Sequence, residues 1–200
     1  METRWDDAVA GHRLSTRSRL ITATVSLLAE HGMAGTTMTA IADRAGVSRP
    51  TLYKHFPDVD HIIAALARQE FAAFREELDA LIDPGWSGVD KLDALIRAHL
   101  RYFASEPDRI GEGSFEAGMS PVVREAVESE LVDHHARIVD VITEGIGDGS
   151  FDPDLDPALT AELIQHVLGG MRHTVNRHGG DPERFAGPVA SLLLDGIAHG

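Results

Sequence analysis

The fold of this chain is decided by residues 36–56, which read TTMTAIADRAGVSRPTLYKHF. The pattern predicts two short helices joined by a tight turn. Gly46 is placed to end the first helix, because glycine adopts the left-handed conformation at little cost. Ser48 can cap the second helix, and Pro50 is tolerated there because the amides of a first helical turn have no intrahelical acceptors. The stretch therefore predicts a helix-turn-helix unit.

Apolar residues recur at helical spacing through most of the remaining sequence, and no alternating pattern typical of a strand reaches a useful length. The chain is therefore expected to be all-α, with about nine helices. Residues 105–120 are broken by glycine and proline and are expected to hold only a short helix and turns. The first helix of the quoted stretch is expected to be capped by Thr36 or Thr37. Before the stretch, we expect one helix from Ser15 or Thr16 to Gly32. After it, we expect helices from Asp58 or Asp60 to about residue 82, over about 88–104 and about 121–144, and two more after residue 157.

The charge of the chain is unevenly distributed. The 200 residues carry a formal net charge of −14, yet residues 11–57 hold six arginines and lysines against two acidic residues. An acidic body would repel DNA and leave only this basic segment to face it.

Composition also excludes some classes of protein. The absence of cysteine excludes disulfides and thiol chemistry. No apolar run approaches the roughly 18–20 residues that span a bilayer, and the N-terminal residues lack the layout of a signal peptide. We therefore expect a cytoplasmic protein with no membrane partner.

A block of motif residues lies at fixed intervals in the N-terminal third of the chain. Its positions are Arg17, residues 28–32 (LAEHG), Thr36-Thr37, Ile41-Ala42, residues 45–48 (AGVS), Leu52-Tyr53 and His55-Phe56. With them, residues of about 16–66 resemble the N-terminal domain of the TetR family of bacterial transcriptional regulators. The family commonly has a lysine just inside the fourth helix, where this chain has Val59, so that helix lacks the usual cation for a phosphate.

The resemblance implies two domains and a function. Residues 15–57 are expected to form the DNA-binding helix-turn-helix domain, and residues 58–200 a helical domain for ligand binding and dimerisation. Residues 1–14 show no clear periodicity and are expected to form a flexible arm.

The outward face of the second helix of the quoted stretch is expected to read DNA. A recognition helix presents its N-terminal side chains to base edges, and Arg49 is best suited to pair with the two acceptors of a guanine. In the alternative interpretation, the arginines are solvated surface charges and Tyr53 belongs to the core. The expected DNA-binding residues are Thr37, Arg44, Ser48, Arg49, Thr51, Tyr53, Lys54 and His55.

The last two predicted helices are expected to form a dimer interface, as the resemblance implies. Useful specificity normally needs two DNA-binding domains, or heads, on half-sites about one helical turn apart. The expected DNA partner is therefore a palindromic or pseudo-palindromic double-stranded operator. Gly169 and Gly170 lie in mid-helix, where they cost helical stability but permit close approach of a neighbouring helix. Alternatively, they relieve crowding within one chain. Leu192 and Leu193 are expected to fill the contact.

The helical body is expected to bind an unknown small-molecule effector, as in the family. Its candidate histidines lie on the apolar faces of three different helices, and converging imidazoles could hold a metal. No pair has the within-helix spacing of a metal motif, so neither a metal site nor a cofactor is predicted. The candidate ligand-binding residues are Phe71, Phe74, His99, Phe103, Phe115, Met119, His134 and His166.

Two other functions remain open. An enzyme, either a hydrolase or a metal-dependent one, could use the histidines and carboxylates of the body, but the sequence has no nucleophile elbow, phosphate loop or HExxH helix. A helical interaction module without DNA binding is favoured only by Val59. The leading prediction is a dimeric DNA-binding repressor, not an enzyme, that a small molecule releases from its operator.

Overall fold

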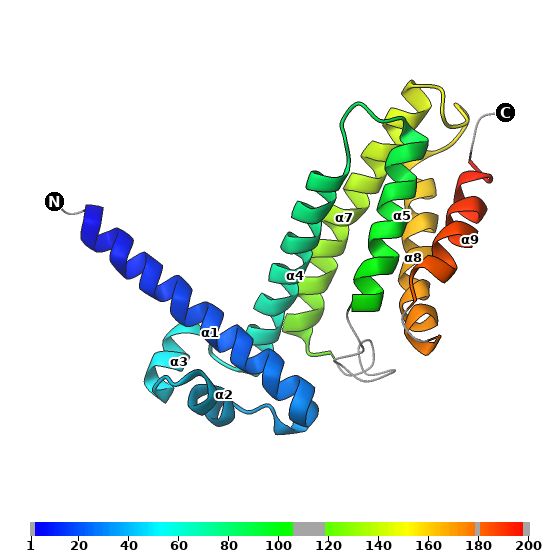
Figure 1. Cartoon of the computed structure of the whole chain (residues 1–200). Coiled ribbons are helices and arrows are strands. Elements are labelled where there is room, and N and C mark those ends of the chain that lie inside the picture. The colour runs from blue at the N-terminus through cyan, green and yellow to red at the C-terminus, as the bar shows by residue number, and fades with distance from the viewer. Residues whose placement is uncertain (1–2, 106–118, 179–180, 198–200) are drawn as a thin grey trace. The chain divides into compact units, whose positions relative to one another are not determined.

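The computed structural model describes residues 3–105, 119–178 and 181–197, and within these ranges the side chains from residue 15 onward. The eight elements in these ranges are all α-helices (Figure 1), which confirms the predicted class. The short helix expected between residues 105 and 120 falls largely outside them. None of the described helices is long and apolar enough to cross a membrane. The helices are α1 (Thr3–Gly35), α2 (Met38–Ala45), α3 (Arg49–His55), α4 (Val59–Leu81), α5 (Gly88–Ser105), α7 (Pro121–Gly147), α8 (Pro157–Arg177) and α9 (Glu183–Leu194).

The chain divides into two compact units. Unit 1 runs to Glu70 and includes α7 up to Val127, and unit 2 holds the rest of α4 and α7 with all of α5, α8 and α9. This division differs from the predicted domain boundary after residue 57. The reason is that Ile62 and Ala65 of α4 are buried in the core of unit 1.

Unit 1 packs α1, α2, α3 and the start of α4 around a small core. Leu20, Ile41, Leu52 and Ile62, one from each helix, are all fully buried. Phe56, at the end of α3, is only 2% exposed. The motif residues Ile41, Leu52 and Phe56 therefore lie in the core of unit 1.

The first helix begins earlier than predicted. Its backbone is helical from Thr3, where a flexible arm was expected over residues 1–14. No proline interrupts this segment, and extending an existing helix needs no new nucleus, so a lack of apolar periodicity does not stop it. The predicted terminator is confirmed at Gly32, whose φ of 64° and ψ of −171° break the regular helix before a last turn to Gly35.

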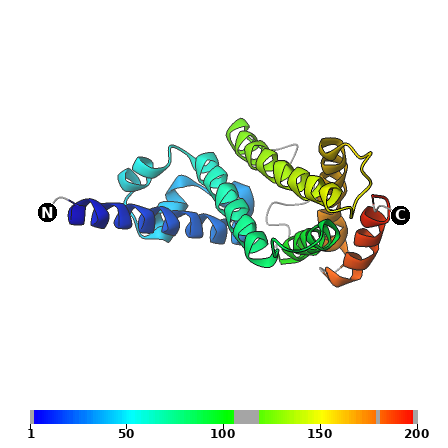
Figure 2. The same ribbon diagram turned by 90° about the horizontal axis from the view of Figure 1, so that it is seen from above.

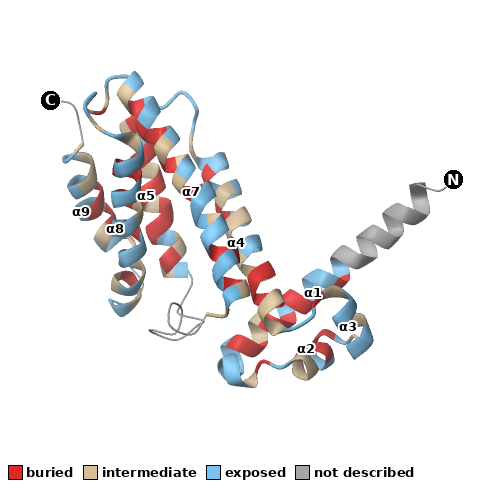
Figure 3. Ribbon diagram, turned by 180° about the vertical axis from the view of Figure 1, so that it is seen from behind, coloured by how far each residue is buried: buried red, intermediate tan, exposed pale blue. Residues whose placement is uncertain are grey.

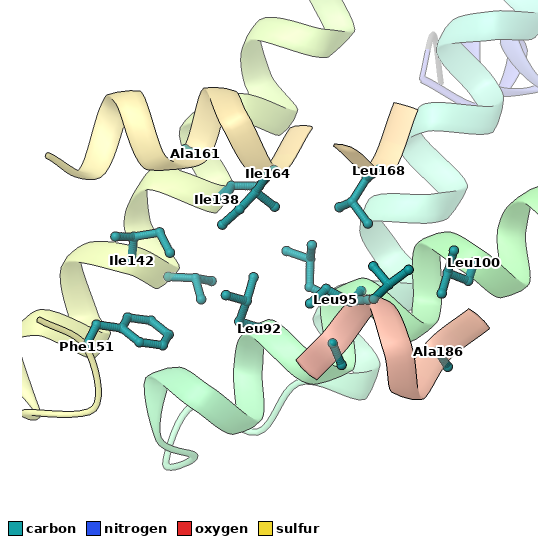
Figure 4. Packing of buried hydrophobic residues seen from close by; sticks show 14 of the residues in the cluster. Leu92, Leu95, Leu100, Ile138, Ile142, Phe151, Ala161, Ile164, Leu168 and Ala186 are labelled. Atoms are coloured by element: carbon teal, nitrogen blue, oxygen red, sulfur yellow. The ribbon is translucent and has the colours of Figure 1, made fainter. Parts of the chain in front are cut away.

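Unit 2 is built around α5, which packs against both α8 and α9 (Figures 1 and 2). Apolar side chains of α5, α7 and α8 meet in one continuous core (Figure 4). Leu92, Leu95 and Ile138 are among its fully buried members. This core belongs to unit 2 alone.

One close crossing in unit 2 depends on two glycines. Gly88 begins α5, Gly145 lies near the end of α7, and the fully buried ring of Phe151 lies against both. A Cβ atom on Gly145 would overlap the Phe151 ring, and one on Gly88 would overlap the backbone of Gly145. The Gly88 amide also donates to Asp148 Oδ2 at 2.8 Å, which holds the α7–α8 loop against the start of α5.

Candidate DNA interface and ligand-binding core

The helix-turn-helix has the local structure that its sequence predicts. Thr37 caps α2, its side chain accepting from the Ala40 amide at 3.2 Å. Gly46 is left-handed, with φ 63° and ψ 39°, and Val47 N–H donates to Ala42 O across the turn at 3.0 Å. Ser48 caps α3 by accepting from the Thr51 amide.

The predicted DNA-binding side chains of α3 lie on its outer face. Leu52 is fully buried, whereas Arg49 and Lys54 are exposed and Tyr53 is 55% exposed. The alternative interpretation required Tyr53 to be a core residue, and this exposure contradicts it. No ion pair engages Arg49 or Lys54 within the described part of the chain. Of the other predicted residues, Thr37, Arg44 and Ser48 are exposed, and Thr51 and His55 are half-buried.

Arg44 differs from the other predicted DNA-binding residues because it has an intramolecular partner. Its two terminal nitrogens donate to the two carboxylate oxygens of Glu30, each at 2.7 Å. This hydrogen bonding raises the pKa of Arg44 and lowers the pKa of Glu30. The pair joins α1 to α2, so Arg44 could reach a phosphate only by giving up or sharing Glu30.

The start of α4 carries no cation in place of the family's lysine. Asp58 caps the helix by accepting from the His61 amide at 3.0 Å, and its carboxylate also contacts His61 Nδ1 at 2.8 Å. The hydrogen bond from His61 lowers the pKa of Asp58. His61 is thus engaged by a neighbouring carboxylate, while Val59 packs against the core of unit 1.

Four of the predicted ligand-binding residues meet inside unit 2. His99 Nε2 lies 2.9 Å from His134 Nε2, and both side chains are buried. Phe74 packs edge-on to His99, with ring centroids 4.7 Å apart, and Phe103 lies 6.1 Å from the same ring. Tyr102, which was not among the predicted residues, also packs against Phe74, with ring centroids 5.0 Å apart. Its position three residues after His99 was the available signal.

The hydrogen bonds of the histidine pair fix where its protons lie. The Leu95 carbonyl can only accept, so His99 Nδ1, at 2.7 Å, carries a proton. A neutral His99 then has a bare Nε2, and His134 Nε2–H must donate to it. Burial and then repulsion by His134 lower the pKa of His99 to about 3. Burial, followed by the charges of Arg137 and Arg75, lowers the pKa of His134 to about 4.

The remaining predicted ligand-binding residues do not join this cluster. Phe71 is half-buried, and Met119 belongs to unit 1. Phe115 lies outside the described residues. His166 is exposed, and its Nδ1 contacts the Glu162 carbonyl of its own helix at 2.8 Å. The three histidines therefore do not converge in one chain, and no group of three or more metal-binding side chains occurs among the residues that the structure describes.

Large apolar side chains are exposed on α8 and α9. The exposed fractions are 54% for Leu159, 59% for Leu163 and 69% for Leu192. Much of the surface of α8 is exposed (Figure 3). Gly169 and Gly170 are also exposed, with nothing within 4 Å of an added Cβ. The glycines therefore do not relieve crowding within unit 2.

Two family models match the chain. One is described as bacterial regulatory proteins of the tetR family and matches residues 20–66. The other is described as a tetracyclin repressor-like C-terminal domain and matches residues 85–197, which is more than half of the chain.

Similar curated proteins are named as regulators. The HTH-type transcriptional repressor KstR2 of Mycolicibacterium smegmatis is 28% identical over 153 residues, covering 76% of this chain and 75% of the relative. The fatty acid metabolism regulator protein of Bacillus subtilis is 26% identical over 185 residues, covering 90% of this chain and 94% of the relative.

Solved structures share the fold over nearly the whole chain. The fatty acid degradation regulator FadR from Bacillus halodurans matches with a TM-score of 0.77 at 23% identity, covering 92% of this chain and 97% of the other. FadR from Bacillus subtilis matches with the same TM-score at 24% identity, covering 90% and 98%. With both domain models matched, the chain belongs to the TetR family of bacterial regulatory proteins and is a ligand-responsive, DNA-binding transcriptional repressor.

Proposed function

We propose that this repressor works as a homodimer, reads a palindromic or pseudo-palindromic operator with α3, and leaves it when an acyl thioester binds unit 2. The observation that carries the proposal is the outer face of α3. Arg49, Tyr53 and Lys54 are exposed there above the buried Leu52, which fixes the direction in which they point. The same proposal places the protein in the cytoplasm, with the DNA.

Each side chain of α3 has a role that fits its chemistry. Arg49, in the first turn, donates two hydrogen bonds to a guanine, because its planar guanidinium matches both acceptors. Thr51 packs on a thymine methyl or binds a phosphate. Lys54 and Tyr53 bind the DNA backbone, with the caps Thr37 and Ser48 and with His55. Arg44 adds a phosphate contact if it exchanges Glu30 for DNA.

The homodimer is supported by the exposed apolar side chains of α8 and α9. Leu159, Leu163 and Val167 recur every four residues and so form one stripe along α8. Gly169 and Gly170 continue the helix with no side chains, which permits a second helix to approach closely. Burying this stripe against the same stripe of a second copy would remove it from water.

The proposed effector has a large apolar body. One structural relative, FadR from Bacillus subtilis, was solved in complex with stearoyl-CoA, and another is the ketosteroid transcriptional regulator KstR2 of Mycobacterium tuberculosis. In this chain, Phe74 and Phe103 would pack against the apolar part of such a ligand. His134 would accept a hydrogen bond through Nδ1, because the proton of this ring lies on Nε2.

The link between effector and DNA is assigned to α4. This helix is unbroken from Val59 to Leu81 (Figure 2), and it carries Ile62 in the core of unit 1 and Phe74 in the aromatic cluster of unit 2. A ligand that displaces Phe74 would act on the helix that also supports the helix-turn-helix. Release requires only that the effector bind the DNA-incompetent arrangement more tightly, by about 1–3 kcal/mol.

The proposal is tested with a duplex that the protein itself selects from random DNA. Fluorescence anisotropy should show binding that weakens steeply as salt rises, and stearoyl-CoA should weaken it further at fixed salt. Free CoA and stearate, which each supply half of that ligand, serve as controls. Failure to select any sequence would overturn the operator proposal, and equal release by stearoyl-CoA and free CoA would overturn the acyl effector.

A further inference from the structure

Arg19 of α1 contacts the turn of the helix-turn-helix directly. Its Nη2 donates to the carbonyl of Ala45, the last residue of α2, and also to the carbonyl of Gly46 at 3.3 Å. A Cβ atom added to Gly46 would lie 3.3 Å from the same nitrogen, so the guanidinium rests against the turn itself. In the sequence alone, Arg19 only contributes to the basic charge of this segment.

This contact satisfies groups that α2 leaves open. The last carbonyls of a helix have no intrahelical donor and form the negative end of its dipole. A guanidinium supplies both the donors and the positive charge that this end requires. Because Arg19 belongs to α1, the contact also fixes α1 relative to the turn from which α3 begins.

A second arginine of α1 contacts the other end of α3. The guanidinium carbon of Arg17 lies 4.4 Å from the centroid of the Phe56 ring, a cation–π distance. Phe56 directly follows α3 and is buried in the core of unit 1. Two arginines of α1 therefore contact the residues just before and just after the recognition helix.

We propose that Arg17 and Arg19 are positioning residues, which orient α3 for DNA reading and make no DNA contact themselves. The proposal rests on the reading role given to α3 above. It separates the five arginines and lysines of residues 15–57, whose side chains the structure describes, into two groups. Arg17, Arg19 and Arg44 are engaged within the protein, and Arg49 and Lys54 face outward.

The salt dependence of binding distinguishes the positioning residues Arg17 and Arg19 from residues that contact phosphates. Each phosphate contact adds about 0.9 to the slope of log affinity against log salt, so a lost contact in both heads of a dimer removes about 2. A positioning residue leaves that slope unchanged, because it displaces no counterion. Its loss instead lowers affinity for the correct sequence more than affinity for other DNA.

The experiment compares Arg19→Gln and Arg17→Gln with the charge-matched control Lys54→Gln. Each is titrated against the duplex selected by the wild type and against a scrambled duplex of equal length. We expect Arg19→Gln to weaken binding to the selected duplex about 10-fold, through lost pre-organisation, with little change for the scrambled duplex and an unchanged slope. Lys54→Gln should weaken both and reduce the slope by about 2.

Amide hydrogen exchange supplies a second readout that needs no DNA. In Arg19→Gln, the amides of Gly46 and Val47 should exchange faster, whereas that of Leu92 in unit 2 should not change. Arg19→Lys, which keeps a donor for one carbonyl, should recover part of both effects. If Arg19→Gln fails to fold, Arg19→Lys and Arg17→Gln carry the same test.

Three results would overturn the proposal. A slope reduced by about 2 in Arg19→Gln would make Arg19 a phosphate contact. Unchanged DNA affinity together with unchanged amide exchange in Arg19→Gln would show that the contact affects neither DNA binding nor the turn. Equal losses on both duplexes would assign Arg19 to general stability. If the wild type selects no sequence, the reading role of α3 fails instead, and the exchange experiment still decides whether Arg19 holds the turn.

Discussion

The two units differ in where the side chains of interest lie. In unit 1 they are on the surface, whereas in unit 2 they are buried. Unit 1 buries an apolar core and carries Arg49, Tyr53 and Lys54 on its surface. Unit 2 buries the polar pair His99 and His134 among aromatic rings. A surface reader works best when the structure beneath it is rigid, whereas a buried polar pair is costly unless its hydrogen bonds are satisfied. Under the proposed function, we therefore expect DNA recognition to depend on a rigid unit 1 and the response to the effector on a change in the interior of unit 2.

The largest expected effect tests whether α8 and α9 of unit 2 form the interface that joins two DNA-binding units in a dimer. Leu163→Glu combined with Leu192→Glu places charges on the exposed stripe of α8 and α9, which should convert the dimer to a 21.6 kDa monomer in sedimentation. Operator affinity should then fall at least about 100-fold, because the second head no longer binds as part of the same molecule. Leu81→Glu on α4, which is 37% exposed, is the control and should remain dimeric. A double variant that still sediments as a dimer would contradict the assigned interface.

The next effect concerns the surface of unit 1. Arg49→Ala should cost about 1–3 kcal/mol of operator binding and relax the base preference at one position, because a bidentate guanine contact is lost. Binding to a panel of single-base operator variants measures both. Arg68→Ala removes an exposed charge from the same unit and should keep the preference intact. Unchanged preference in Arg49→Ala would show that another residue reads that base.

A change in the interior of unit 2 should affect stability without affecting reading. Gly145→Ala drives a methyl group into the buried ring of Phe151, and overpacking of this kind costs about 1–3 kcal/mol. Thermal unfolding measures the loss. Gly147→Ala, two residues later in α7 and with nothing near its added Cβ, should be neutral or slightly stabilising. Equal melting temperatures for the two variants would contradict the packing at this crossing.

The smallest expected effect is the pH dependence of stability that the pair His99 and His134 causes. Both histidines have a folded pKa below the unfolded value of 6.5, so the unfolded chain binds more protons as the pH falls. The stability that these rings support is therefore complete above pH 6.5 and is lost on acidification. Between pH 7 and 6, the wild type should lose about 1 kcal/mol more than the variant His99→Leu/His134→Leu. Urea unfolding at each pH measures this, and parallel curves for the two proteins would disprove it.

Local signals made the helix-turn-helix predictable from the sequence. The roles of Thr37, Gly46 and Ser48 depend on partners within a few residues, so residue type and spacing were sufficient. The early start of α1 was missed because residues 1–14 show no apolar periodicity, and that periodicity was the signal used to predict helices.

Long-range contacts could not be read from the sequence. His99 and His134 are 35 residues apart, and nothing in the pattern of either helix indicates that their rings meet. The same limit applies to the basic residues of unit 1. Arg19 and Arg49 have the same side chain, and only the packing of α1 on the turn shows that the first is already engaged.

The crossing of Gly88, Gly145 and Phe151 has a consequence for the order of folding. Unit 1 completes its core with residues between 20 and 66, whereas unit 2 must bring α5 to the end of α7, almost 60 residues away. Closing a longer loop costs more entropy, and chains rich in distant contacts fold more slowly. We therefore expect a nascent chain to form its DNA-reading part first, before the part that senses the effector exists.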